Sequence, residues 1–218
     1  MELSELEACL DSPDPQCRMR AIAGLRDYEP EQAVPLLKRR IYDDRFMIRA
    51  LVAAGLGHKR NPEGFEVLLT LIGRETDYNV IAEAANSLSK FGSQAIPHLV
   101  KIFEQQSHWL VRISILAGME DIDSPETLLH LCRLGLSGDN PTVKEAAIAN
   151  IARLKGTATM AEAVELVCQL ATDSNASIRA QAARLLRHLG GSQAETALNE
   201  LRQDRDAQVV KAVLEGLL

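Results

Sequence analysis

The chain has 218 residues, of which 46% are hydrophobic and 25% charged, and this composition excludes a disordered protein. Only 4% are aromatic, so Leu, Ala, Ile and Val must supply the core, which favours closely packed helices over a β-sandwich. The 24 Lys and Arg residues against 30 Asp and Glu give a net charge of -6, which argues against a protein that binds nucleic acid over its whole surface.

The N-terminal segment, residues 1–5, is acidic, whereas a signal or transit peptide would be basic. No uncharged apolar stretch reaches the roughly 18 residues that a membrane span requires. We therefore expect a cytoplasmic protein without a membrane-spanning helix. Residues 2–10 are expected to form a short leading helix that caps the N-terminal end of the fold.

From there one pattern recurs about every 31 residues and predicts a repeat architecture. In each copy a basic position follows an aliphatic residue or Cys. Apolar residues come three, four and seven positions later, which places a broad apolar stripe on one face of a helix. The residue six positions later is mostly small, as a close helix crossing requires. The basic position falls at Arg18, Arg49, Ile81, Arg112, Lys144, Arg179 and Val210.

A second apolar-periodic segment precedes each of these helices, and Asp, Asn or Ser residues between the two can cap the second helix. Pro62, Pro125 and Pro141 lie near helix starts, where proline is tolerated. Pro35 and Pro97 fall inside predicted first helices and are expected to kink them. The predicted first helices span residues 31–42, 63–72, 95–103, 126–136, 160–171 and 193–201.

The kink prolines, the aspartates of the turns and a Val-Arg-x-x-Ala-x-x-x-Leu frame, clearest at Val111-Arg112 and Ile178-Arg179, resemble HEAT repeats over essentially the whole chain. The resemblance implies an all-α fold, a right-handed α-solenoid of seven helix pairs, with residues 1–218 as one domain. Ile81 and Val210 depart from the frame, so a ladder of basic side chains along the turns should be interrupted there.

Motifs for catalysis or metal binding are not found in the sequence. Cys9, Cys17, Cys132 and Cys168 form no pair with zinc-site spacing, and we expect buried free thiols. The five histidines are scattered through different repeats, and no two lie four residues apart. We therefore predict no metal, no organic cofactor and no catalytic residue, which favours a protein that is not an enzyme.

Positive charge is concentrated near the N-terminus, because residues 18–60 hold ten Lys or Arg against five acidic residues, and residues 61–218 hold 14 against 20. Arg49 is expected to pair with an aspartate of the next repeat, but Lys38, Arg39 and Arg40 cannot all pair with Asp43 and Asp44. The surplus predicts a basic patch that binds an acidic partner. Its members are Arg39, Arg40, Arg45, Arg49, Lys59 and Arg60.

Two further features indicate protein binding. The outward row of the second helices lines the concave face of a HEAT fold and is rich in alanine, which predicts a shallow groove. Leu51 and Ala54 are its most apolar part, and His58 follows them in the row. Trp109, the only tryptophan, follows His108 in a turn that normally holds small polar residues. It either seals the junction with the next turn or forms an exposed hot spot.

The short repeats and the run HWLVRISIL at residues 108–116 look like a cyanobacterial HEAT-like group that includes phycobilin lyase subunits, phycobilisome-degradation proteins and a partner of an iron–sulfur scaffold. Our main hypothesis is a non-enzymatic protein-binding scaffold or assembly chaperone, monomeric or heterodimeric, whose partner is an acidic protein and neither nucleic acid nor membrane. The resemblance implies an alternative, a phycobilin lyase subunit, to whose tetrapyrrole pocket His58, Tyr42 and the arginine cluster would contribute. A HEAT-fold DNA glycosylase is disfavoured by the net charge.

Overall fold

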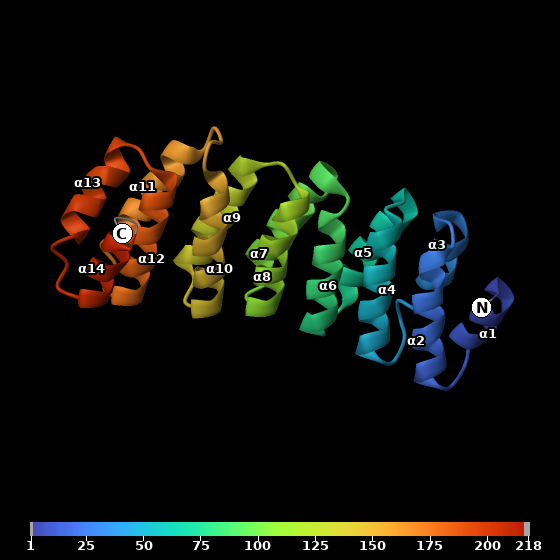
Figure 1. The fold of residues 1–218 in the computed structure, drawn as a ribbon. Helices are drawn as coiled ribbons and strands as arrows, with labels where there is room; N and C mark the ends of the chain where they lie inside the picture. Colours follow the sequence, from blue (N-terminus) through green and yellow to red (C-terminus); the bar gives the residue numbers. More distant parts are fainter. Residues whose placement is uncertain (1, 216–218) are drawn as a thin grey trace. The chain divides into compact units, whose positions relative to one another are not determined.

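The computed structural model describes residues 2–215, and within that range the chain is helical with no β-strand (Figure 1). It forms two compact units, unit 1 (Met1–Asp123) and unit 2 (Ser124–Leu218), which are described separately. That residues 1–218 form one domain stays a prediction. In the described range, none of the helices has the length and apolar character needed to cross a bilayer.

Unit 1 contains four helix pairs, in which each odd-numbered helix is followed by an even-numbered one. The pairs stack so that α4 packs on α2 and α6, and α6 packs on α8. The helices are α1 (Leu3–Leu10), α2 (Pro15–Gly24), α3 (Pro30–Lys38), α4 (Phe46–Lys59), α5 (Pro62–Arg74), α6 (Tyr78–Ser89), α7 (Ile96–Gln105) and α8 (Trp109–Gly118).

Unit 2 continues the same alternation with three further pairs, and its α12 packs on α14. The helices are α9 (Pro125–Ser137), α10 (Pro141–Ile151), α11 (Met160–Leu170), α12 (Ala176–Leu189), α13 (Ser192–Leu201) and α14 (Ala207–Leu214). The seven predicted helix pairs and the α-solenoid are thereby confirmed for the described residues.

The periodic apolar positions form the core, as the pattern predicts. Leu88, Val111 and Ile115 are all fully buried. The small residues of the repeat permit close helix crossings, because a Cβ added to Gly118 would lie 2.8 Å from the Cβ of Ser89 on the preceding even-numbered helix. The helix-crossing role inferred for these small residues is therefore confirmed at Gly118.

Proline explains two boundaries that differ from the sequence prediction. Pro97 does not kink a longer helix; it is the second residue of α7, which follows a short 3-10 turn, Gly92–Ala95. Proline is tolerated there because the first amides of a helix have no intrahelical partner. Pro35 does lie inside α3, and this helix ends at Lys38, before the predicted end at residue 42.

The N-terminal helix α1 caps unit 1, with Leu6 and Leu10 fully buried. Cys9 of α1 and Cys17 of α2 form a disulfide, with Cα atoms 5.2 Å apart, so the expectation of four free thiols is wrong. The short turn between the antiparallel helices brings the two cysteines together. Cys132 and Cys168 are free, the first buried and the second partly buried.

Candidate functional site

A pocket between α2 and α4 brings together four residues that the sequence singled out, namely Leu51, Ala54, His58 and Lys59. It has a volume of about 250 Å³ and is mostly apolar. Leu25 and Leu37, both 1% exposed, form its floor. We call it the α2–α4 pocket. Its remaining lining residues are Ile22, Ala23, Arg26 and Gly55.

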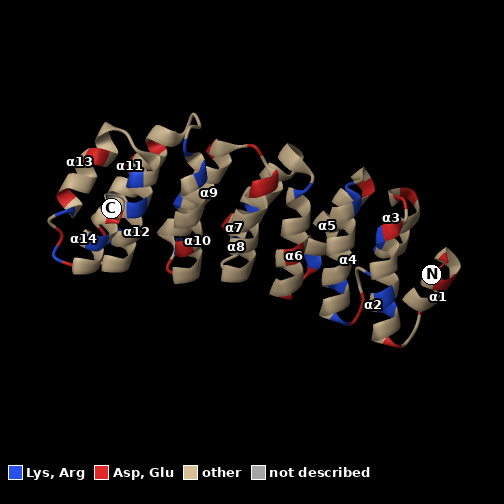
Figure 2. Cartoon of the chain, in the orientation of Figure 1, with Lys and Arg blue, Asp and Glu red and all other residues tan. Residues whose placement is uncertain are grey.

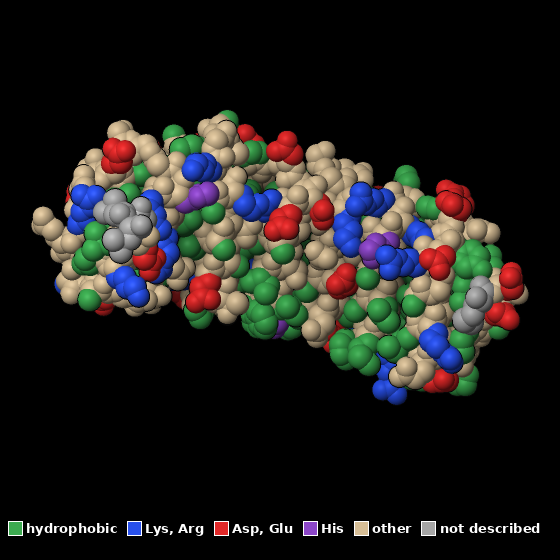
Figure 3. Space-filling model, in the orientation of Figure 1, with side chains coloured by type: hydrophobic (Ala, Val, Ile, Leu, Met, Phe, Trp, Pro, Cys, Tyr) green, Lys and Arg blue, Asp and Glu red, His purple; other side chains and the backbone are tan. Residues whose placement is uncertain are grey.

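The pocket has a cationic rim, which Figure 3 shows as basic and histidine side chains beside hydrophobic ones over α2, α4 and α6. Lys59 donates a hydrogen bond of 2.7 Å to the backbone oxygen of Arg26 and another to the backbone oxygen of Tyr28. These bonds tie the end of α4 to the turn after α2 and so fix the width of the pocket. Lys59 uses carbonyl groups for this and no carboxylate.

His58 lies at this rim on α4 and is surrounded by positive charge. Burial lowers the pKa of His58, and the nearby Lys90, Arg26, Arg60 and Lys59 lower it further. Each of these groups disfavours the imidazolium form. His58 is therefore a neutral hydrogen-bonding group at neutral pH, in a field that attracts anions.

Most of the predicted basic patch is paired within the protein, as Figure 2 shows by the neighbouring basic and acidic segments of unit 1. Lys38 bonds Glu63 at 2.9 Å, while Arg39 and Arg40 both bond Asp11 at the end of α1. The inference that these three must leave surplus charge missed partners 25 to 29 residues away. Arg39 and Arg40 thus fasten the N-terminal cap.

Arg45 is the most exposed of the patch arginines in unit 1. Its side chain is 63% exposed, and its contact with Asp44 is long, at 3.7 Å. Such a contact contributes little in water. Among the predicted patch residues, Arg45 is therefore available to a partner, whereas the charges of Arg39 and Arg40 are already matched.

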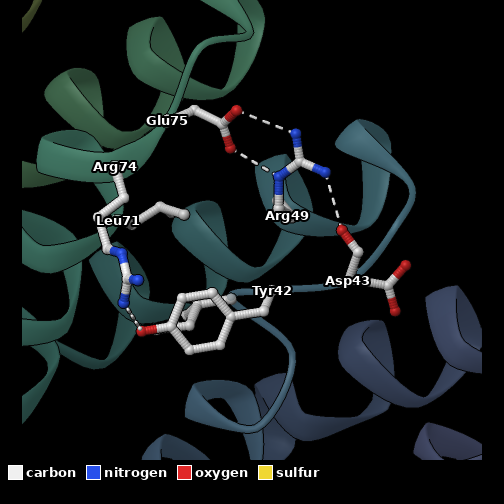
Figure 4. A pocket seen from close by; sticks show the side chains of 7 residues that line it. Tyr42, Asp43, Arg49, Leu71, Arg74 and Glu75 are labelled. Atoms are coloured by element: carbon white, nitrogen blue, oxygen red, sulfur yellow. Dashed lines mark hydrogen bonds and ion pairs between the residues drawn. The ribbon is translucent and has the colours of Figure 1, made fainter.

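Arg49 belongs to a ladder between successive turns, and Figure 4 shows its surroundings. Its guanidinium donates to both carboxylate oxygens of Glu75 at 2.6 and 2.9 Å and to the backbone oxygen of Asp43 at 2.8 Å. Burial alone would raise the pKa of Glu75, but bonds from Arg49 and two backbone amides outweigh it and lower that pKa. Arg49 is thus held by the next repeat, as expected.

The same arrangement occurs at two other turns. Arg18 bonds Asp43 and Asp44 at 3.0 Å, and in unit 2 Arg179 bonds both oxygens of Asp204 at 2.8 Å. The ladder is interrupted at the third repeat, because Ile81 takes the basic position and is buried. This interruption agrees with the prediction from the sequence.

Trp109 is the first residue of α8 and is 41% exposed, at an edge distant in sequence from the α2–α4 pocket. The His108 ring stacks on Tyr78 with centroids 3.9 Å apart and lies 5.8 Å from the Trp109 ring. The predicted residues therefore fall on two surfaces of unit 1. One is the pocket, and the other is an edge where aromatic residues begin α4, α6 and α8: Phe46, Tyr78 and Trp109.

Sequence reasoning missed several residues at these surfaces. Tyr78 was detectable, since it occupies the position of Trp109 one repeat earlier. Arg26 and Lys90 were not singled out, because they stand at helix ends far apart in sequence, and only the stacking of repeats brings them to His58.

The fold and these surfaces define an α-solenoid, a stack of helix pairs that forms a repeat scaffold. The chain belongs to the HEAT-repeat family, whose model matches residues 36–120 and 128–218. No curated protein is similar to it in sequence.

Two solved structures resemble the chain over most of its length. One is the complex of CpcE and CpcF of phycocyanin lyase from Nostoc sp. PCC7120, with 20% identity and a TM-score of 0.56, covering 100% of this chain and 95% of that one. The other is YibA of Escherichia coli, with 18% identity and a TM-score of 0.60, covering 97% and 80%. At these identities the similarity establishes the fold.

Proposed function

We propose that the protein is a non-enzymatic binding scaffold or assembly chaperone that holds an acidic partner protein against unit 1. The observation that carries this proposal is the α2–α4 pocket, where an apolar hollow of about 250 Å³ opens beside unmatched positive charge. Apolar pockets with a polar rim are where binding energy concentrates in protein interfaces. Arg45 and the exposed Trp109 are further contact candidates in the same unit.

The size of the pocket favours this proposal over a small-molecule function. Sites for drug-sized ligands have volumes of about 300–1,000 Å³. The α2–α4 pocket falls below that range and suits a side chain of a partner. Conjugated ligands as large as a tetrapyrrole would have to lie mostly outside it.

The experiment is affinity capture from the native cell with the wild type and two variants. Leu51→Asp places a carboxylate at the pocket, where Leu51 is 37% exposed, so folding should survive. Ala146→Asp makes the matched change on α10 of unit 2, at the equivalent position of its repeat. Loss of the captured partner with Leu51→Asp and retention with Ala146→Asp are expected. Equal capture by all three proteins would overturn the proposal.

A second candidate function is a subunit of a phycobilin lyase, favoured by the full-length structural similarity to the phycocyanin lyase complex. It is tested by mixing the purified protein, alone and with partners captured above, with a bilin and an apo-phycobiliprotein. Covalent pigment transfer, seen as zinc-induced fluorescence of the denatured phycobiliprotein, would favour the lyase. Its absence with every partner would leave the scaffold.

A further inference from the structure

The shape of the α2–α4 pocket specifies the size of its occupant. Its floor of Leu25 and Leu37 is buried, and Ala23 and Ala54 leave its walls low. Gly55 keeps the floor open, because a Cβ at this position would lie 3.1 Å from Cδ1 of Leu37. An apolar cavity of about 150 Å³ holds one benzene molecule. A pocket of about 250 Å³ therefore accepts one large aliphatic or aromatic side chain.

The charge around the pocket specifies the chemistry beside that side chain. Arg26 lies on the rim, and Arg60 and Lys90 act on His58 with positive charge. Within residues 2–215, these three cations form no ion pair, in contrast to Lys38 and Arg49 nearby. Unmatched cations beside an apolar hollow are complementary to carboxylates that flank an apolar residue.

The acidic residue nearest to this group does not cancel the field. Glu83 on α6 lies near Lys90, and its carboxylate accepts a long hydrogen bond of 3.4 Å from Ser87. Burial raises the pKa of Glu83, which weakens its negative charge as a counterion. A carboxylate from outside would meet a net positive rim.

We propose that the α2–α4 pocket anchors an acidic segment of a partner protein, in which one large apolar side chain enters the pocket and flanking carboxylates face Arg26, His58 and Lys90. This inference rests on the proposed scaffold function and names the chemistry that the partner presents. An apolar anchor gives the contact its affinity, and the flanking charges select acidic segments and speed their approach.

The test is a methyl NMR titration of the full chain with N-acetylated, C-amidated hexapeptides. The probe is Glu-Glu-Leu-Leu-Glu-Glu, and two controls replace every Glu by Gln or by Lys. The Glu peptide should shift the methyl signals of Leu51 and Ala54. The Gln peptide should bind at least about threefold more weakly, as the loss of exposed ion pairs predicts, and the Lys peptide should not bind. Shifts confined to other methyl groups, or equal affinity of the Glu and Gln peptides, would overturn the inference.

Variants then assign the charge effect to named residues. The double variant Arg26→Gln/Lys90→Gln should lower the affinity for the Glu peptide to that for the Gln peptide. The control Lys101→Gln/Lys144→Gln removes the same net charge away from the pocket and should bind like the wild type at physiological salt. Circular dichroism verifies that both variants are folded. Equal affinities of the two double variants for the Glu peptide would refute a role of these cations.

The two proposals can fail separately. Capture lost with Leu51→Asp but unaffected by Arg26→Gln/Lys90→Gln would leave the scaffold standing and reject acidic recognition. Capture that survives Leu51→Asp would reject the scaffold site itself, whatever the peptides do.

Discussion

Replacing Gly57 by Ala should destabilise the protein, because α4 and α6 approach each other most closely at this residue. A Cβ at Gly57 would lie 2.6 Å from both the Cβ and the Oγ of Ser87, and 3.0 Å from its Cα. Since a backbone atom is involved, the helices must move apart. Overpacking of this kind costs about 1–3 kcal/mol. The same substitution gains up to about 1 kcal/mol of helix propensity, which must be separated from the clash.

Gly73→Ala supplies that separation, since Gly73 lies in α5 and a Cβ there would meet no atom within 4 Å. The free energy of unfolding is measured by urea titration with circular dichroism. Gly57→Ala should be about 1–3 kcal/mol less stable than Gly73→Ala, and adding Ser87→Gly should recover most of the difference. Equal stability of the two single variants would refute the close approach, and with it the geometry that places Lys90 beside His58.

Three other outcomes test the account. Leu88→Ala should lower the free energy of unfolding by about 2–5 kcal/mol, because Leu88 is fully buried; a loss below about 0.5 kcal/mol would contradict the repeat register. Hydrogen bonds from Arg179 lower the pKa of Asp204 from 3.8 to about 2, so its stabilising effect is complete above the unfolded value and lost as the pH falls through the folded one. Asp204→Asn should therefore destabilise at pH 7 and have no effect near pH 1, as thermal melts across pH would show. Burial raises the pKa of Cys132 to about 12, so a thiol reagent should label Cys168 in the native protein and Cys132 only after unfolding, as mass spectrometry would report; native labelling of Cys132 would contradict its burial.

The fold was predictable because the repeat places the same side-chain chemistry at the same helical position seven times. Leu88 and Val111 are buried for this reason, and the ladder arginines Arg18 and Arg49 bond the next turn. Local signals were enough for each helix, and the period supplied the stacking.

The site was only partly predictable, because its electrostatics depend on pairs that the period does not encode. Asp11 reaches Arg39 and Arg40 from the cap helix, so a charge surplus in the sequence is largely matched in the fold. Substituting these two arginines by Glu would loosen α1 as well as change the surface. The single substitution Arg45→Glu therefore tests the basic patch more cleanly than a change of all three.

The Cys9–Cys17 disulfide was missed for a related reason. A separation of eight residues matches no metal-binding motif, and only the antiparallel packing of α1 on α2 brings the two Cα atoms to 5.2 Å. The preference for free thiols came from the expected compartment, which carries no geometric information.

The central claim, that the α2–α4 pocket of unit 1 holds a protein partner, is tested most directly by photocrosslinking in the native cell. A photoreactive phenylalanine is placed at Leu51, at the pocket, or at Ala146, the equivalent position in unit 2. The account predicts a discrete crosslinked adduct from position 51 that is absent from position 146, and the adduct should weaken when Arg26 and Lys90 are replaced by Gln. No adduct from position 51, or the same adduct from both positions, would contradict it.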